Sequence, residues 1–117
     1  MNRVIVFLFL IMTSLVSAVF AQDNKDIATG QFRVSGNCNM CKQRIEDAAY
    51  GKGVKSAEWD KTTGVLTIVY RPSKTSAADI LQRVAAAGHD ADTLQASKKA
   101  YEGLPACCSY RTHPHHH

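Results

Sequence analysis

Several features that mark large protein classes are missing from this sequence. It contains no internal repeat and no cluster of Lys and Arg interleaved with aromatic residues, which argues against nucleic acid as the partner. No serine, paired carboxylate or His/Cys arrangement has the spacing of a hydrolytic site. The chain has 117 residues, so we expect one domain at most.

A long membrane-spanning run is also missing. Residues 4–16 are almost uninterrupted apolar sequence, whereas a spanning helix usually needs about 20 apolar residues. Arg3 precedes this run, and Val19 and Ala21 suit the −3 and −1 positions of a signal-peptidase site. We therefore predict a signal peptide over residues 1–21 and an exported, periplasmic or secreted protein without a membrane anchor. The alternative is an uncleaved anchor.

The four cysteines all follow the predicted cleavage site. In an exported protein an even number of cysteines usually indicates disulfides. Here they form two local pairs, Cys38 with Cys41 and Cys107 with Cys108. A bridge within a close pair closes almost no chain, and vicinal cysteines bridge only with strain. The grouping therefore predicts metal or redox sites in place of a disulfide framework.

Apolar periodicity predicts an α+β domain over residues 31–95. Strands are expected at 31–35, 54–60 and 65–70, helices at 39–50 and 77–87, and a short polar edge strand at 89–94. This β-α-β-β-α-β order is that of the ferredoxin-like sandwich, a four-stranded antiparallel sheet with both helices on one face. Residues 22–30 form a polar lead. Residues 96–117 form a Cys/His-containing C-terminal tail, with a helical turn at 97–103 and irregular structure from Leu104 on.

Cys38 and Cys41 lie where the first strand is expected to lead into the first helix. Two intervening residues allow both sulfurs to converge on one ion, and the positive end of the helix dipole favours the thiolate form that binds metal. Soft thiolates select Cu(I), Zn(II) and Hg(II) over Mg and Ca. Two protein ligands suit Cu(I) or Hg(II) better than structural Zn(II), which normally takes four.

At these residues the sequence resembles the heavy-metal-associated domain family, which includes copper chaperones, modules of copper-pumping ATPases and periplasmic mercuric-ion-binding proteins. Beyond the loop at 36–41, the resemblance rests on residues 45–46, 53–57, 63–70, Ile80 with Val84, and 87–91. It implies that Cys38 and Cys41 hold a metal ion and pass it to a partner by thiolate exchange.

The sequence departs from the family pattern in three places. The loop Gly36-Asn37-Cys38 is one residue shorter than the family's Gly-Met-Thr-Cys and lacks its methionine. His89 stands where the family commonly has Tyr or Phe, and an imidazole there is either a third ligand or a half-exposed substitute for the aromatic ring. The third departure is the tail.

The tail carries a cluster of metal-ligating residue types. Short Cys/His-rich tracts suggest metal capture. We expect either a second soft-metal site or extra ligands that fold back onto Cys38 and Cys41; the alternatives are a vicinal disulfide and a histidine tract from a cloning tag. The candidate ligands are Cys107, Cys108, His113, His115, His116 and His117.

We therefore expect a non-enzymatic, exported carrier of a soft metal ion, with Cu(I) ahead of Hg(II) and Zn(II). Its expected partner is a copper-transporting ATPase or another membrane transporter, and a homodimer bridged by metal is a further expectation. The alternatives are a periplasmic mercuric-ion-binding protein, a CxxC thiol-disulfide oxidoreductase and an interaction module whose cysteines staple a loop. Against the oxidoreductase, the chain lacks a Trp-Cys-Gly-Pro type of loop.

Overall fold

The computed structural model describes residues 26–112. The predicted signal peptide at 1–21 therefore lies outside the described residues, as do the four tail histidines, His113, His115, His116 and His117. Within the described part of the chain, no helix has the length and apolar character needed to cross a membrane.

Three strands form an antiparallel sheet in the order β1-β3-β2. The strands are β1 (Ala28–Arg33), β2 (Val54–Trp59) and β3 (Val65–Tyr70). β3 has the predicted bounds because its run of β-branched and apolar residues suits a central strand. β1 begins three residues earlier than predicted, since Ala28 pairs with Tyr70 and Gly30 pairs with Ile68.

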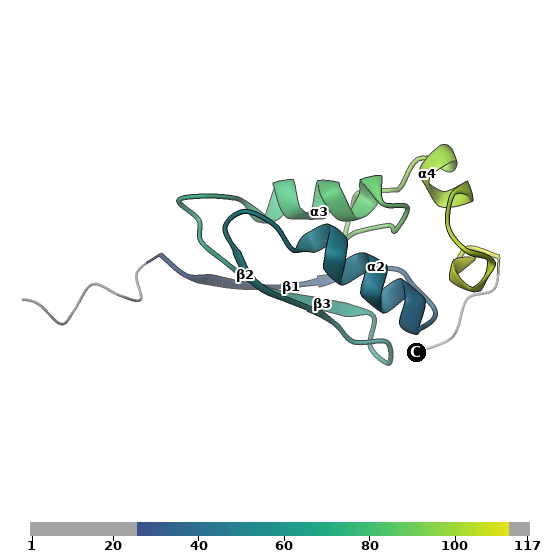
Figure 1. The fold of residues 1–117 in the computed structure, drawn as a ribbon, viewed down its shortest axis with the longest axis horizontal. Helices are drawn as coiled ribbons and strands as arrows, with labels where there is room; N and C mark the ends of the chain where they lie inside the picture. The colour runs from purple at the N-terminus through teal and green to yellow at the C-terminus, as the bar shows by residue number, and fades with distance from the viewer. Residues whose placement is uncertain (1–25, 113–117) are drawn as a thin grey trace, which may run out of the picture.

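Two helices cover one face of this sheet (Figure 1). They are α2 (Asn39–Ala49) and α3 (Ala77–Ala86). Ser76 caps α3, because its hydroxyl accepts a hydrogen bond from the Asp79 N–H at 3.1 Å. Gly88 follows the helix at φ 109°, and a Cβ there would lie 2.7 Å from the Ala100 carbonyl oxygen. This position therefore favours glycine.

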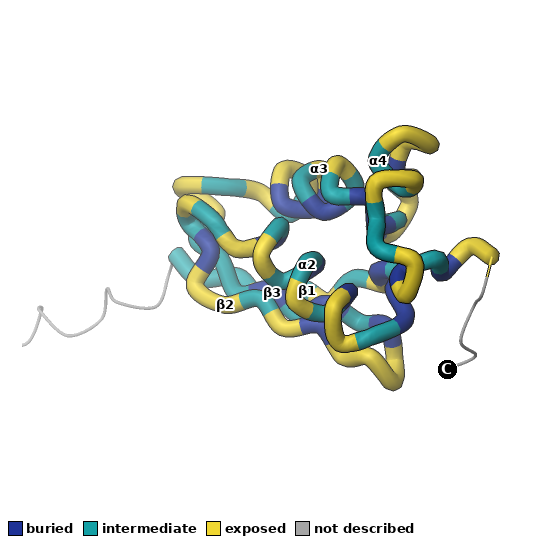
Figure 2. Tube along the Cα trace, turned by 45° about the vertical axis from the view of Figure 1, so that its right-hand side comes forward, coloured by how far each residue is buried: buried dark blue, intermediate teal, exposed yellow. Residues whose placement is uncertain are grey.

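The core lies between the sheet and the two helices, and in α3 the buried residues face the sheet (Figure 2). Trp59 is fully buried there, and its indole N–H donates a 2.9 Å hydrogen bond to the Val34 carbonyl. Met40, in the first turn of α2, is 51% exposed. The apolar side chains of the core come from the sheet, the helices and the loops beside them: Val34, Cys41, Ile45, Ala49, Val54, Trp59, Leu66, Ile68, Ile80, Leu81, Val84, Ala91 and Cys108.

The predicted fourth strand at 89–94 is not a strand of the sheet, which has three strands in the described residues. One bridge joins Ala91 to Val34, supported by hydrogen bonds from Ser35 N to the Asp90 carbonyl and from Asp92 N to the Arg33 carbonyl. The pairing stops there because Asp92 takes a positive φ of 54° and the chain turns back on itself at Leu94. Where the ferredoxin-like sandwich has a fourth strand, the described residues therefore form only one bridge to the chain after β1.

In the C-terminal segment, which we define as residues 97–112, the part from Leu104 on is not irregular as the sequence predicted. It contains α4 (Lys98–Glu102), capped by the Ser97 hydroxyl, and the 3₁₀ turn η1 (Ala106–Cys108). Cys108 is fully buried and Tyr110 is 7% exposed, so the segment packs onto the core. The helical turn predicted at 97–103 is confirmed.

Candidate metal centre

The loop from β1 into α2 fixes the position of the first cysteine pair. Cys38 occupies the N-cap of α2 with extended backbone, and Cys41 lies in the first turn, where its side chain is fully buried. Gly36 leaves room for this arrangement, since a Cβ there would lie 3.1 Å from Cys41, Ile45 and Trp59. The sulfurs of Cys38 and Cys41 lie 3.3 Å apart, at the positive end of the α2 dipole.

The basic side chains near the pair have other partners. Lys42 lies 2.6 Å from the Glu46 carboxylate and donates a 2.9 Å hydrogen bond to the Trp59 carbonyl. Arg44 donates to the Ala87 carbonyl at 3.4 Å. Both side chains are therefore engaged by partners within the protein.

The second cysteine pair joins the first. The structure forms a disulfide between Cys41 and Cys108, whose Cα atoms are 5.9 Å apart across 67 positions of sequence. The sequence predicted local pairs without a long-range bridge, and that prediction is wrong. It fails because η1 folds back against the start of α2, a contact that spacing along the chain does not reveal.

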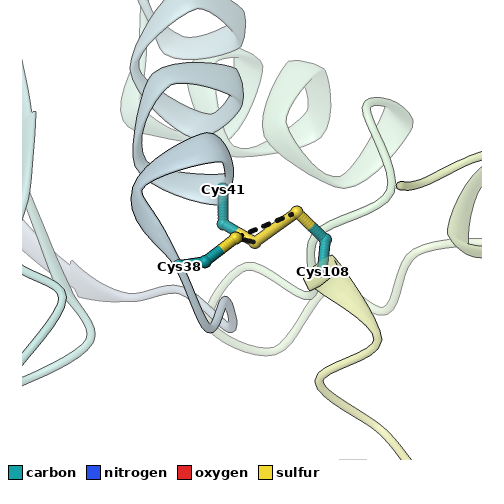
Figure 3. A group of neighbouring side chains, drawn as sticks. All are labelled: Cys38, Cys41 and Cys108. Atoms are coloured by element: carbon teal, nitrogen blue, oxygen red, sulfur yellow. Dashed lines mark hydrogen bonds between the residues drawn. A yellow bond between two sulfur atoms is a disulfide. The ribbon is translucent and has the colours of Figure 1, made fainter. Parts of the chain in front are cut away.

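Four sulfurs thus meet at one place. The Cys38 sulfur lies 3.7 Å from that of Cys108 and 3.3 Å from that of Cys107. Cys38 and Cys41 point from the start of α2 toward Cys108, which comes from the C-terminal segment (Figure 3). The Met40 thioether lies 3.9 Å from the Cys107 sulfur. Of the two expected arrangements of the tail cysteines, the structure therefore has the one in which they fold back onto the first pair.

Among the described residues, Cys38, Cys41 and Cys108 form a group whose sulfurs all lie within 4.8 Å of one another and can hold a metal ion. Cys107 lies outside this group and is exposed. Its hydrogen bond with Cys38 raises the pKa of the Cys107 thiol, and partial desolvation adds to the effect. Cys107 therefore keeps its proton to a higher pH than an ordinary cysteine.

His89, for which we expected either a third ligand or a half-exposed ring, is not among these three residues and is fully buried. Its Nδ1 lies 2.8 Å from the Ser35 carbonyl oxygen, and its ring stacks on Tyr110 with centroids 5.8 Å apart. The pKa of His89 is lowered, mainly because burial disfavours the charged form of the ring. The side chain therefore fills the aromatic position as a neutral ring between the loop and the C-terminal segment.

The C-terminal segment is held by two residues that sequence reasoning missed. The Tyr110 hydroxyl donates to the Gly88 carbonyl at 2.7 Å and accepts from the Asp90 N–H at 3.0 Å. Arg111 forms an ion pair with Asp90 at 2.7 Å and donates to the Ala96 carbonyl at 2.9 Å. No periodicity in the sequence marks these contacts, since each joins a single side chain to a loop.

No family model and no curated protein sequence matches this chain. Several solved structures are similar to it. A structure described as the CopZ metallochaperone is 26% identical, with a TM-score of 0.53, and the match covers 55% of this chain and 98% of that one. A copper form of a CopA variant from Bacillus subtilis is 26% identical, with a TM-score of 0.50, over 57% of this chain and 91% of that one. The N-terminal domain of the zinc(II) ATPase ZiaA is 34% identical over 78% of this chain and 80% of that one, with a TM-score of 0.49.

The fold and the site together define an α+β domain that presents a cysteine pair where a strand leads into a helix. The matches to the CopZ and CopA structures extend over nearly the whole length of those chains. This protein belongs to the heavy-metal-associated domain family.

Proposed function

We propose that this protein is an exported carrier of a soft metal ion, with Cu(I) as its cargo, held by the thiolates of Cys38 and Cys41. The observation that carries the proposal is the position of these two sulfurs. They lie 3.3 Å apart at the N-terminus of α2; Cys38 is a free thiol, and Cys41 becomes one when its disulfide with Cys108 is reduced. Thiolates in this arrangement bind soft ions.

The donor set favours a soft cargo. All the ligand atoms of the group are sulfurs, with no carboxylate among them. Hard ions such as Mg²⁺ and Ca²⁺, which prefer oxygen ligands, would therefore bind weakly here. Copper in particular is supported by the similar CopA structure, which is a copper form, whereas the similar ZiaA domain comes from a zinc(II) ATPase. Hg(II) is the second candidate, because it too accepts few sulfur ligands.

The exposure of the two cysteines suits transfer. Cys41 is fully buried, whereas Cys38 is partly exposed, so an incoming thiolate reaches the ion on the side of Cys38. The partner's thiolate forms one metal–sulfur bond as the bond to Cys38 breaks, and a second exchange then releases Cys41. The proposed partner is a copper-transporting ATPase or another membrane transporter, and a metal-bridged homodimer would use the same exposed side.

Export is part of the proposal. It is supported by the signal-peptide pattern at 1–21 and by the Cys41–Cys108 disulfide, since disulfides persist mainly in oxidising compartments. The same disulfide favours a second candidate function, thiol-disulfide exchange, because the free thiol of Cys38 lies 3.3 Å from the Cys41 sulfur.

A titration with Cu(I) against a competing chelator tests the proposal. The reduced protein is expected to bind one ion, and Cys38→Ser combined with Cys41→Ser is expected to abolish this binding. Cys38→Ser alone leaves the buried Cys41 and the core in place, so it separates loss of binding from loss of fold, which circular dichroism monitors. Unchanged stoichiometry and affinity in the double variant would refute the carrier. A redox enzyme would instead reduce an insulin disulfide without metal, and Cys38→Ser would stop it.

A further inference from the structure

Cys108 reaches the metal site from outside the part of the chain that carries the cysteine pair. It lies in η1, and its buried sulfur is 3.7 Å from that of Cys38 and is bonded to that of Cys41. We propose that Cys108 is a third thiolate ligand of the same ion, and that the Cys41–Cys108 disulfide is the closed, oxidised form of this three-sulfur site. The inference rests on the proposed function.

The distances suit a three-coordinate ion. An ion bound in a plane by three thiolates at ~2.3 Å holds its sulfurs about 4 Å apart. The Cys38 sulfur already lies 3.3 Å and 3.7 Å from the other two. Once the disulfide is reduced, the Cys41 and Cys108 sulfurs need only move apart from bonding distance to make this triangle. Three thiolates suffice for Cu(I) or Hg(II), whereas Zn(II) usually takes four ligands.

The segment that carries Cys108 does not depend on the disulfide alone. Tyr110 and Arg111, two and three residues further on, bind the chain at Gly88, Asp90 and Ala96. These contacts keep η1 against the start of α2 when the disulfide is open. The third ligand is therefore held in place before the ion arrives, which lowers the entropic cost of binding.

A dithiol reductant can open the site. One of its thiolates attacks a sulfur of the Cys41–Cys108 bond and forms a mixed disulfide, which its second thiol resolves. The reductant loses two electrons and two protons as it becomes a disulfide, and Cys41 and Cys108 gain them as thiols. The ion then displaces the thiol protons as it binds. Metal uptake is thereby conditional on reduction.

Cys107 provides the matched control, because it is the neighbour of Cys108 but is exposed and outside the three-sulfur group. We would prepare Cys108→Ser, Cys107→Ser and Cys38→Ser, reduce each with a phosphine under argon, and load them with Cu(I). X-ray absorption counts the sulfurs around copper, and competition with a chelator gives the affinity. The wild type and Cys107→Ser are expected to show three sulfurs. Cys108→Ser is expected to show two, with at least tenfold weaker binding, a loss of ~1.4 kcal/mol.

Three sulfurs and unchanged affinity in Cys108→Ser would overturn the inference, as would two sulfurs in the wild type. If Cys108→Ser behaves as the wild type while Cys38→Ser loses binding, the inference fails and the proposed carrier stands. If Cys38→Ser also binds as the wild type, the carrier itself fails. Protein with the disulfide intact is expected to hold less than about a tenth of the Cu(I) bound by reduced protein in the same chelator, a tenfold difference in affinity or more. Equal uptake would refute the dependence on reduction.

Discussion

The sheet with its two helices and the C-terminal segment are held in different ways. In the first region, side chains on regular periods pack into one core, and Trp59, Leu66, Ile68, Ile80 and Val84 are all fully buried. The C-terminal segment adds few buried side chains and is secured by individual bonds: a disulfide, a tyrosine hydroxyl and an arginine ion pair.

The two regions therefore have different roles: the core determines the stability of the fold, and the C-terminal segment adjusts the metal site. The core packs against the loop that presents Cys38 and Cys41. The C-terminal segment contributes one buried sulfur, and its contacts can be broken one at a time. If this division is correct, changes in the core should lower global stability, whereas changes in the segment should alter the site with little loss of fold.

The largest effect is expected from Trp59→Ala. The substitution empties a fully buried position and removes the indole hydrogen bond to the Val34 carbonyl, beside the loop that leads to Cys38. We expect the free energy of unfolding in urea to fall by about 3–5 kcal/mol. Tyr50→Ala, at a side chain that is 62% exposed, is the control and should change it by less than about 0.5 kcal/mol. Equal effects of the two would contradict a core centred on Trp59.

A smaller effect is expected from Tyr110→Phe, which leaves the Gly88 carbonyl and the Asp90 N–H without this partner. Such losses cost about 1–3 kcal/mol. In reduced protein we expect hydrogen exchange to accelerate in residues 104–112 and to stay slow in β3. Tyr50→Phe serves as the control. Uniform acceleration across β3 would show that the segment and the core unfold as one unit.

Much of the core could be predicted from the sequence because local patterns determine it. The apolar pattern at 65–70 predicted β3 with its bounds, and the apolar periodicity at 77–87 predicted α3 to within one residue. The fourth strand was wrong because a left-handed residue, Asp92, turns the chain after one bridge. That turn is marked by no glycine or proline.

The metal site, too, could be predicted only in part from the sequence. The positions of Cys38 and Cys41 follow from a strand-to-helix junction, which the sequence indicates. The pairing of Cys41 with Cys108 does not, because it depends on how η1 returns over the core. Tyr110 and Arg111 determine that return, and single side chains that bond to loops leave no periodic signal.

The smallest expected effect concerns His89, which lies where the two regions meet. Its ring contacts the Ser35 carbonyl on the core side and stacks on Tyr110 on the other. Burial lowers its pKa in the folded state below the usual 6.5, so the unfolded chain binds the proton more readily. Stability is therefore complete above about pH 6.5 and decreases as the pH falls from there toward the lowered pKa.

His89→Phe keeps an aromatic ring in this position and removes the titrating group. We expect the melting temperature of the wild type to fall between about pH 7.5 and about pH 5, and that of the variant to fall less. His89 is the one histidine in residues 26–112, and the tail histidines are common to both proteins, so the difference between the two curves isolates it. Parallel curves would mean that the folded state accepts the proton as readily as the unfolded chain. In that case the C-terminal segment must open enough in acid to hydrate the ring, and the contact between the two regions would be weaker than the stacking on Tyr110 implies.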